Sequence, residues 1–164
     1  PIQSLNDNKD KIIIKGNPKK KMVALVVDHN EEVKNYLKQN NIKYTLIANS
    51  EDVIDKKEEY INGETDEKLF SNLNSILNHK KVNSKLCLVG KSNLELCKEK
   101  KFYLFKYSID MDNNLIKNIN EVSAGDIIYV SPNSALPKLK VLLNEISRVD
   151  LEIVYLSKLI SEEN

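Results

Sequence analysis

The order of apolar and polar residues predicts a chain that alternates between strands and helices. Met22 to Val27 is an unbroken apolar run, which is typical of a strand covered on both faces, as the strands of parallel sheets are. Apolar residues at helical spacing follow from Glu31 to Gln39, and a second apolar run spans Tyr44 to Ala48. Strand, helix and strand in this order form the repeating unit of α/β folds.

The alternation continues along the chain with one interruption. Lys56 to Glu67 is nearly all polar and is expected to be a loop, and an amphipathic helix follows with its apolar stripe at Leu69, Leu73, Ile76 and Leu77. Further strands are predicted at 12–14, 85–89, 102–109, 126–130 and 152–156, and further helices at 92–100, 114–120 and 135–147. We expect an α/β fold with a mainly parallel sheet, as a single domain over residues 11–164 after a flexible N-terminal lead, residues 1–10. Because the chain begins at Pro1, we also expect an upstream piece to have been removed.

Composition excludes several functions. Among 164 residues, 25 basic and 24 acidic side chains leave a formal charge of +1, which gives nucleic-acid binding no support. The apolar runs are far shorter than the roughly 20 residues that a membrane-spanning helix needs, so no membrane span is expected. Cys87 and Cys97 lack the spacing of a zinc ribbon. We expect two reduced, buried thiols, with one isolated disulfide as the alternative.

Polar residues at the ends of the predicted strands are the candidates for a binding site. Ligands of parallel α/β folds bind at the carboxyl ends of the strands, where such residues meet. The set here is Asp28, His29, Asn49, Ser50, residues 91–93, Asp110, Asp112, Ser131 and Asn133. It suits a sugar or a weakly held cation better than catalysis. Gly90-Lys91-Ser92 is similar to the end of a phosphate-binding loop, but Lys85 stands where that motif requires glycine.

Several of these residues also have purely structural interpretations. Asp28 could cap the helix that starts near Glu31, and Asp110 and Asp112 are typical of a turn held by side-chain to backbone bonds. His79, at the end of a helix, is expected to be an exposed cation. The tyrosines within strand runs are expected to pack in the core; they are Tyr103, Tyr107, Tyr129 and Tyr155.

The order of motifs resembles that of the polysaccharide deacetylases, which are carbohydrate esterases. Val23-Ala24-Leu25 followed by Val26-Val27-Asp28-His29-Asn30 is similar to the family's first motif, Thr-Phe-Asp-Asp-Gly after Val-Ala-Leu. Segment 41–47 resembles the second strand, Asn-Ile-Lys-Ala-Thr-Phe-Phe, and segment 107–110 resembles Trp-Ser-x-Asp. Segment 124–131 resembles Pro-Gly-x-Ile-Ile-Leu-Leu-His, and 135–159 follows the closing helix and strand. The resemblance implies a shortened or distorted (β/α) barrel of the deacetylase type.

The resemblance also implies which site residues are kept and which are replaced. In the family, one aspartate and a His-x-x-x-His pair hold a divalent metal, commonly zinc, while a second aspartate acts as base and a late histidine as acid. By position, Asp28 matches the base, His29 replaces the metal-binding aspartate, and Ser131 replaces the acid histidine. The chain has no histidine between His29 and His79, so the pair is absent from its expected place.

We therefore expect a deacetylase-like domain without activity, which acts as a binding or scaffold module. Asp28 is then a remnant of the base, His29, Asp110 and Ser131 are ligand-binding candidates, and no metal or cofactor is expected. The resemblance implies an extracytoplasmic location, at the bacterial cell envelope or spore, with a glycan or protein partner there. One alternative is a metal-dependent deacetylase of N-acetylated sugars or peptidoglycan whose site is rebuilt from Asp28, His29 and Asp110 around zinc. The other is a receiver-like open sheet, suggested by segment 27–33.

Overall fold

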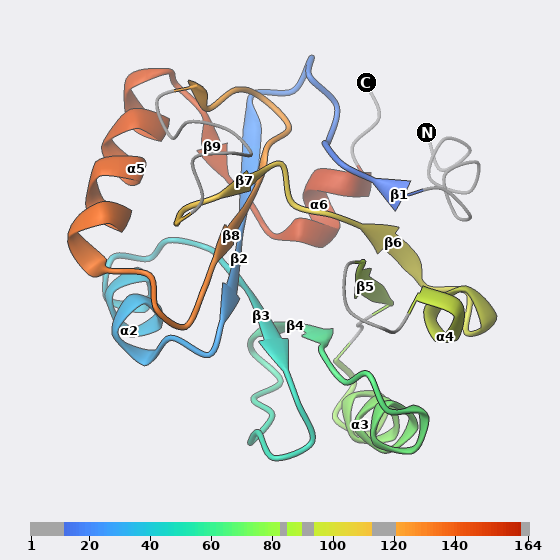
Figure 1. The fold of residues 1–164 in the computed structure, drawn as a ribbon. Coiled ribbons are helices and arrows are strands. Elements are labelled where there is room, and N and C mark those ends of the chain that lie inside the picture. The colour runs from blue at the N-terminus through green and yellow to red at the C-terminus, as the bar shows by residue number, and fades with distance from the viewer. Residues whose placement is uncertain (1–11, 83–84, 90–93, 113–120, 162–164) are drawn as a thin grey trace.

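The computed structural model describes residues 12–82, 85–89, 94–112 and 121–161. The N-terminal lead, residues 1–10, and the helix expected at 114–120 lie outside these ranges. All strand pairs of the described residues are parallel, and helices alternate with the strands (Figure 1). The predicted α/β class and mainly parallel sheet are therefore confirmed. None of the helices in the described ranges is long and apolar enough to span a membrane.

The larger sheet is built around β2 (Met22–Asp28). Its strand order is β4-β3-β2-β8-β7, with β3 (Thr45–Ala48), β4 (Glu59–Asn62), β7 (Ile109–Asp110) and β8 (Ile127–Val130); β9 (Glu152–Ile153) pairs with the start of β2. A second sheet has the order β1-β6-β5, with β1 (Ile12–Ile13), β5 (Leu86–Leu88) and β6 (Tyr103–Phe105). This pair of sheets is a shortened barrel-like arrangement rather than the single open sheet of a receiver.

The apolar run of β2 is buried on both faces, as its sequence predicts. Val23, Leu25 and Val27 belong to one hydrophobic cluster, and the alternate residues Met22, Ala24 and Val26 belong to another. Side chains alternate between the two faces of a strand, so β2 separates the two clusters. Figure 1 shows α2 (Glu31–Gln39) and α5 (Leu136–Arg148) on one side of β2, and α6 (Leu156–Ser161) on the other.

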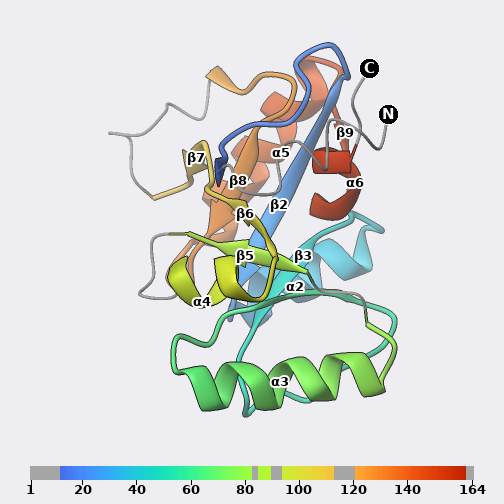
Figure 2. The ribbon, with the colours of Figure 1, turned by 90° about the vertical axis from the view of Figure 1, so that its right-hand side faces the viewer.

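The remaining helices cover the second sheet. Figure 2 shows α4 (Leu94–Glu99) beside β5 and β6, and α3 (Glu67–His79) along the adjoining edge of the molecule. A third hydrophobic cluster joins these elements, and within it the rings of Phe70 and Phe102 lie 5.3 Å apart. His79 lies exposed in the last turn of α3, as predicted.

Three boundaries differ from the sequence prediction. The segment expected to be a loop, Lys56 to Glu67, contains β4, whose Tyr60 and Ile61 are buried. The run at 102–109 is divided into β6 and β7, because Tyr107 and Ser108 leave the second sheet and lead to the first. The run at 152–156 ends its strand at Ile153, and Leu156 already begins α6.

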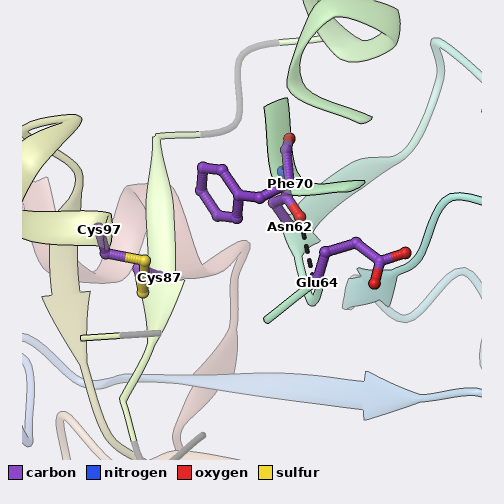
Figure 3. The surroundings of a disulfide bond; sticks show 5 residues. All are labelled: Asn62, Glu64, Phe70, Cys87 and Cys97. Carbon is purple, nitrogen blue, oxygen red and sulfur yellow. Dashed lines mark hydrogen bonds between the residues drawn. A yellow bond between two sulfur atoms is a disulfide. The ribbon is translucent and has the colours of Figure 1, made fainter. Parts of the chain in front are cut away.

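The expectation of two reduced cysteines was wrong. Cys87 of β5 and Cys97 of α4 form a disulfide, with their Cα atoms 6.2 Å apart, and both residues are fully buried (Figure 3). Sequence separation alone could not show that the helix returns against its own strand. Figure 3 also shows the buried amide of Asn62, which donates to the Phe70 carbonyl at 2.9 Å and accepts from the backbone of Glu64 at 3.1 Å. These bonds fix the end of β4 against α3.

Candidate functional site

The candidate site lies where β2 ends. Asp28 is the last residue of β2, and His29 turns the chain with a left-handed φ of 43°. Asn30 then caps α2, because its side chain accepts a hydrogen bond from the amide of Val33 at 3.1 Å. The cap is thus Asn30, and the suggestion that Asp28 has this role was wrong. The side chain of Asp28 instead contacts His29 and Tyr129 at the strand ends.

The imidazole of His29 lies between two carboxylates. Its Nδ1 is 2.8 Å from Oδ1 of Asp28, and its Nε2 is 2.8 Å from Oδ2 of Asp52. An ionised carboxylate only accepts hydrogen bonds, so this geometry favours a ring that carries a proton on each nitrogen and donates from both. Burial lowers the pKa of His29, but the hydrogen bonds and charges of Asp28 and Asp52 outweigh it and raise the pKa above 6.5. The two carboxylates therefore favour the protonated form of His29.

Tyr129 of β8 completes this group, which we call the strand-end cluster: Asp28, His29, Asp52 and Tyr129. The Tyr129 hydroxyl donates to Oδ2 of Asp28 at 2.6 Å, so both oxygens of that carboxylate are hydrogen-bonded. Burial and this bond raise the pKa of Tyr129, which stays a neutral donor. Tyr107 stacks on the Tyr129 ring with the centroids 4.8 Å apart. The predicted packing role of these two tyrosines is confirmed, and Tyr129 also has a polar contact.

A second set of hydrogen bonds lies beside the cluster, at the end of β8. Oδ2 of Asp112 accepts from the hydroxyls of Ser131 at 2.8 Å and Ser134 at 2.6 Å. The amide of Asn30 donates to the carbonyls of both serines at 3.0 Å, which ties the start of α2 to this loop. Asp110 pairs with Tyr129 in the strand register, and its Oδ1 accepts from the amide of Asp112 at 3.0 Å. The turn predicted at these aspartates is therefore present.

The structure places the predicted site residues in small separate contacts at the ends of β2, β7 and β8. Asp28 contacts His29, and Ser131 contacts Asp112, while Asp110 lies next to Tyr129. Residues 91–93 lie outside the described ranges. The sequence analysis missed Asp52, which reaches the site because its Oδ2 also accepts from the amide of Asn49 at 2.8 Å in a tight loop. The only available signal was its position four residues after a buried strand.

The metal that the deacetylase resemblance implies does not fit the donors at this site. Within the described ranges, no group of three His, Cys, Asp or Glu side chains is placed to hold a metal ion. His29 has no free lone pair while both nitrogens donate, and a doubly protonated imidazole is not a ligand. The Asp28 and Asp52 oxygens already face this cation.

Comparison with known proteins gives the class of the fold. No protein-family model matches the sequence, and no curated protein sequence matches it either. Solved structures do match, and they show that the chain has the fold of carbohydrate esterase family 4, the polysaccharide deacetylases.

Three of these structures show how far the likeness extends. A peptidoglycan N-acetylglucosamine deacetylase superposes with a TM-score of 0.74 at 15% identity, over 99% of this chain and 98% of the other. A pseudoenzyme of the same family from Bacillus anthracis has a TM-score of 0.72 at 14% identity, over 94% of this chain and 70% of the other. The chitin deacetylase of the fungal pathogen Colletotrichum lindemuthianum has a TM-score of 0.65 at 10% identity, over 94% and 93%. At these identities the likeness establishes the fold.

Proposed function

We propose that this protein is a deacetylase-like domain without deacetylase activity, which works as a binding module. The observation that carries the proposal is the placement of His29 between Asp28 and Asp52, with a hydrogen bond at each ring nitrogen. A cation of the protein itself then holds the two carboxylates together, and the site has no use for a metal ion. The similar fold of a family pseudoenzyme supports a loss of activity on this scaffold.

The proposal also rests on the chemistry that the site lacks. Metal-assisted hydrolysis depends on a bound water whose pKa the metal lowers, and on a group that protonates the leaving amine. By the resemblance, that acid falls at Ser131, whose hydroxyl instead donates to Asp112. Asp28 accepts from both Tyr129 and His29, so it is poorly suited to take a proton from water. The remnant base is thus a structural acceptor in this proposal.

We propose a glycan as the ligand and an extracytoplasmic location. The half-buried Tyr107 stacks next to Tyr129 beside Asp28, and aromatic faces beside carboxylates suit sugar rings and their hydroxyls. The Cys87–Cys97 disulfide supports a location outside the cytosol, because disulfides persist in oxidising compartments. The fold likeness to a peptidoglycan deacetylase is consistent with the cell envelope.

Acetate release tests the loss of activity. The protein, refolded or incubated with zinc, is mixed with N-acetylglucosamine oligomers or peptidoglycan, and acetate and bound metal are measured. The proposal predicts background acetate and substoichiometric zinc, equal to those of an Asp28→Asn variant. Stoichiometric zinc with acetate release that Asp28→Asn abolishes would overturn the proposal and establish the rebuilt metal site instead.

Calorimetry with the same oligomers tests the glycan. Tyr107→Ala should weaken binding about tenfold, in line with roughly 1.4 kcal/mol for a lost stacking contact. Tyr36→Ala, which removes a half-buried tyrosine from α2, is the control and should leave the affinity unchanged. Absence of binding by the unmodified protein, or equal losses in both variants, would contradict a glycan site here.

A further inference from the structure

Two adjoining pockets on the face where the strands begin are each lined by three lysines. One, of about 320 Å³, lies between the end of α2 and the starts of β3 and β4. The other, of about 770 Å³, lies between the loop before β4 and the end of α3. Asp55 lines both, so the pockets form one surface, which we call the basic groove. Its lysines are Lys38, Lys43, Lys57, Lys56, Lys80 and Lys81.

The positive charge of the basic groove is not neutralised within the described part of the chain. All six lysines are exposed, and none forms an ion pair with another described residue. Lys43 lies over the ring of Tyr155, with Nζ 5.7 Å from its centroid. Two carboxylates, Asp55 and Glu58, line the same surface, and Glu58 is also engaged by Lys34 at 3.6 Å and by the Tyr44 hydroxyl at 2.6 Å. Among the lining residues, lysines therefore outnumber carboxylates six to two.

This concentration of charge does not follow from composition, because the whole chain carries only +1. It arises because lysines lie in the last turn of α2, directly after α3 and before β3 and β4, and these positions meet on one face of a parallel fold. Like charges placed together repel one another, and an anionic ligand removes that cost. The basic groove and the strand-end cluster approach each other at the loop after β3, where Val53 follows Asp52 in the chain, but no residue of the cluster lines the groove.

We propose that the basic groove binds a linear phosphate-bearing polymer. Lysine ammonium groups bind phosphate as point charges, and two adjoining pockets with cations along both suit successive phosphates better than one small anion. The walls also include the apolar residues Ile42, Val53 and Ile54, against which the apolar parts of a polymer backbone can pack. The interaction is governed by charge and is therefore sensitive to salt.

The chain contains a matched control for this proposal. Helices α3 and α4 both end in a lysine pair, Lys80-Lys81 and Lys100-Lys101, and the second lysine of each has a left-handed φ, 60° and 61°. Both pairs are exposed, but only Lys80 and Lys81 line the basic groove. Changing either pair to glutamine removes the same charge from the same kind of helix end. The two double variants therefore differ only in location.

Calorimetric titration with inorganic polyphosphate at several salt concentrations tests the proposal. We expect binding that weakens as salt rises, about tenfold weaker binding for Lys80→Gln/Lys81→Gln, and a log-log salt slope smaller by about 1.5, because two charges are lost. Lys100→Gln/Lys101→Gln should stay within about twofold of the unmodified protein. No binding at low salt, equal losses in both variants, or equally tight binding of polyglutamate would overturn the phosphate-polymer proposal.

Discussion

Nε2 of His29 lies 2.8 Å from Oδ2 of Asp52, a contact that joins the end of β2 to the loop after β3. The same carboxylate oxygen accepts from the amide of Asn49, so the loop itself holds Asp52 in place. The side chain of His29 is 38% exposed and that of Asp28 is 13% exposed, so the cluster is at the rim of the fold and within reach of solvent protons. Its charge state is therefore open to direct measurement.

Replacing His29 with asparagine should destabilise the protein more at low pH than at high pH. Asparagine keeps the left-handed backbone at this position but cannot supply a cation. Because the pKa of His29 is raised in the folded state, its stabilisation is fully present below pH 6.5 and is lost as pH rises through the folded-state value.

Urea unfolding at pH 6 and pH 9 measures this difference. We expect His29→Asn to cost about 1 kcal/mol at pH 6, since the half-exposed pair is screened by solvent, and less at pH 9. His79→Asn is the control, because this exposed histidine lies in the last turn of α3 and forms no ion pair with a carboxylate among the residues that the structure describes. Equal losses for His29→Asn at both pH values would show that the ring is held without its charge.

Removing the negative charge of Asp52 should lower the pKa of His29. Asp52→Asn keeps the size of the side chain but loses one of the two carboxylates whose bonds and charges raise that pKa. Glu51→Gln removes the neighbouring exposed carboxylate, whose charge is not among the causes of the shift, and is the matched control. An NMR titration of the His29 ring should show the pKa fall in the first variant only.

Tyr129→Phe should cost about 1.5 kcal/mol of unfolding free energy. The lost hydroxyl donates to a charged acceptor, Asp28, and such bonds stabilise more than neutral ones. Tyr107→Phe is the control, because it keeps the ring stack and the Tyr107 hydroxyl has no hydrogen-bond partner within the described ranges. Thermal and urea unfolding of both variants would separate the contribution of the polar contact to the unfolding free energy from that of ring packing. Equal losses would mean that the hydroxyl of Tyr129 contributes nothing specific.

Loss of the Cys87–Cys97 disulfide should destabilise the protein by about 2 to 3 kcal/mol. The bond spans a sequence separation of 10, and chain entropy in the unfolded state gives this magnitude for such a loop. Cys87→Ala/Cys97→Ala should unfold at lower urea, and a reductant should shift the unmodified protein to the same midpoint. A reductant that lowers the midpoint of the double variant as well would point to a cause other than this bond.

Much of the fold could be predicted from the sequence because its central strands are continuous apolar runs. Met22 to Val27 has no polar interruption, and the strand lies buried between two clusters as expected. The short strand β4 could not be recognised, because Tyr60 and Ile61 stand between polar residues. Its buried Asn62 looks like a loop residue, yet its amide is satisfied by Phe70 and Glu64, which no local pattern reveals.

Only the site residues at the ends of strands could be predicted from the sequence. Asp28 ends β2, and His29 and Ser131 come directly after β2 and β8, so a parallel sheet brings them to one face. Asp52 belongs to a loop whose path depends on its own bond to Asn49, and the disulfide depends on how α4 packs on β5. Contacts of this kind are tertiary, and hydrophobic periodicity carries no information about them.

The protonation state of His29 tests the central claim most directly. The chain has two histidines, so a ¹⁵N-detected NMR titration resolves both rings, and His79→Asn assigns them. The account predicts that at pH 6.5 most His29 rings carry protons on both nitrogens, because the pKa of His29 lies above 6.5, and that stoichiometric zinc leaves its signals unchanged. A His29 ring that is mainly neutral at pH 6.5, or that shifts with one equivalent of zinc, would contradict the claim that this site is organised by an internal cation.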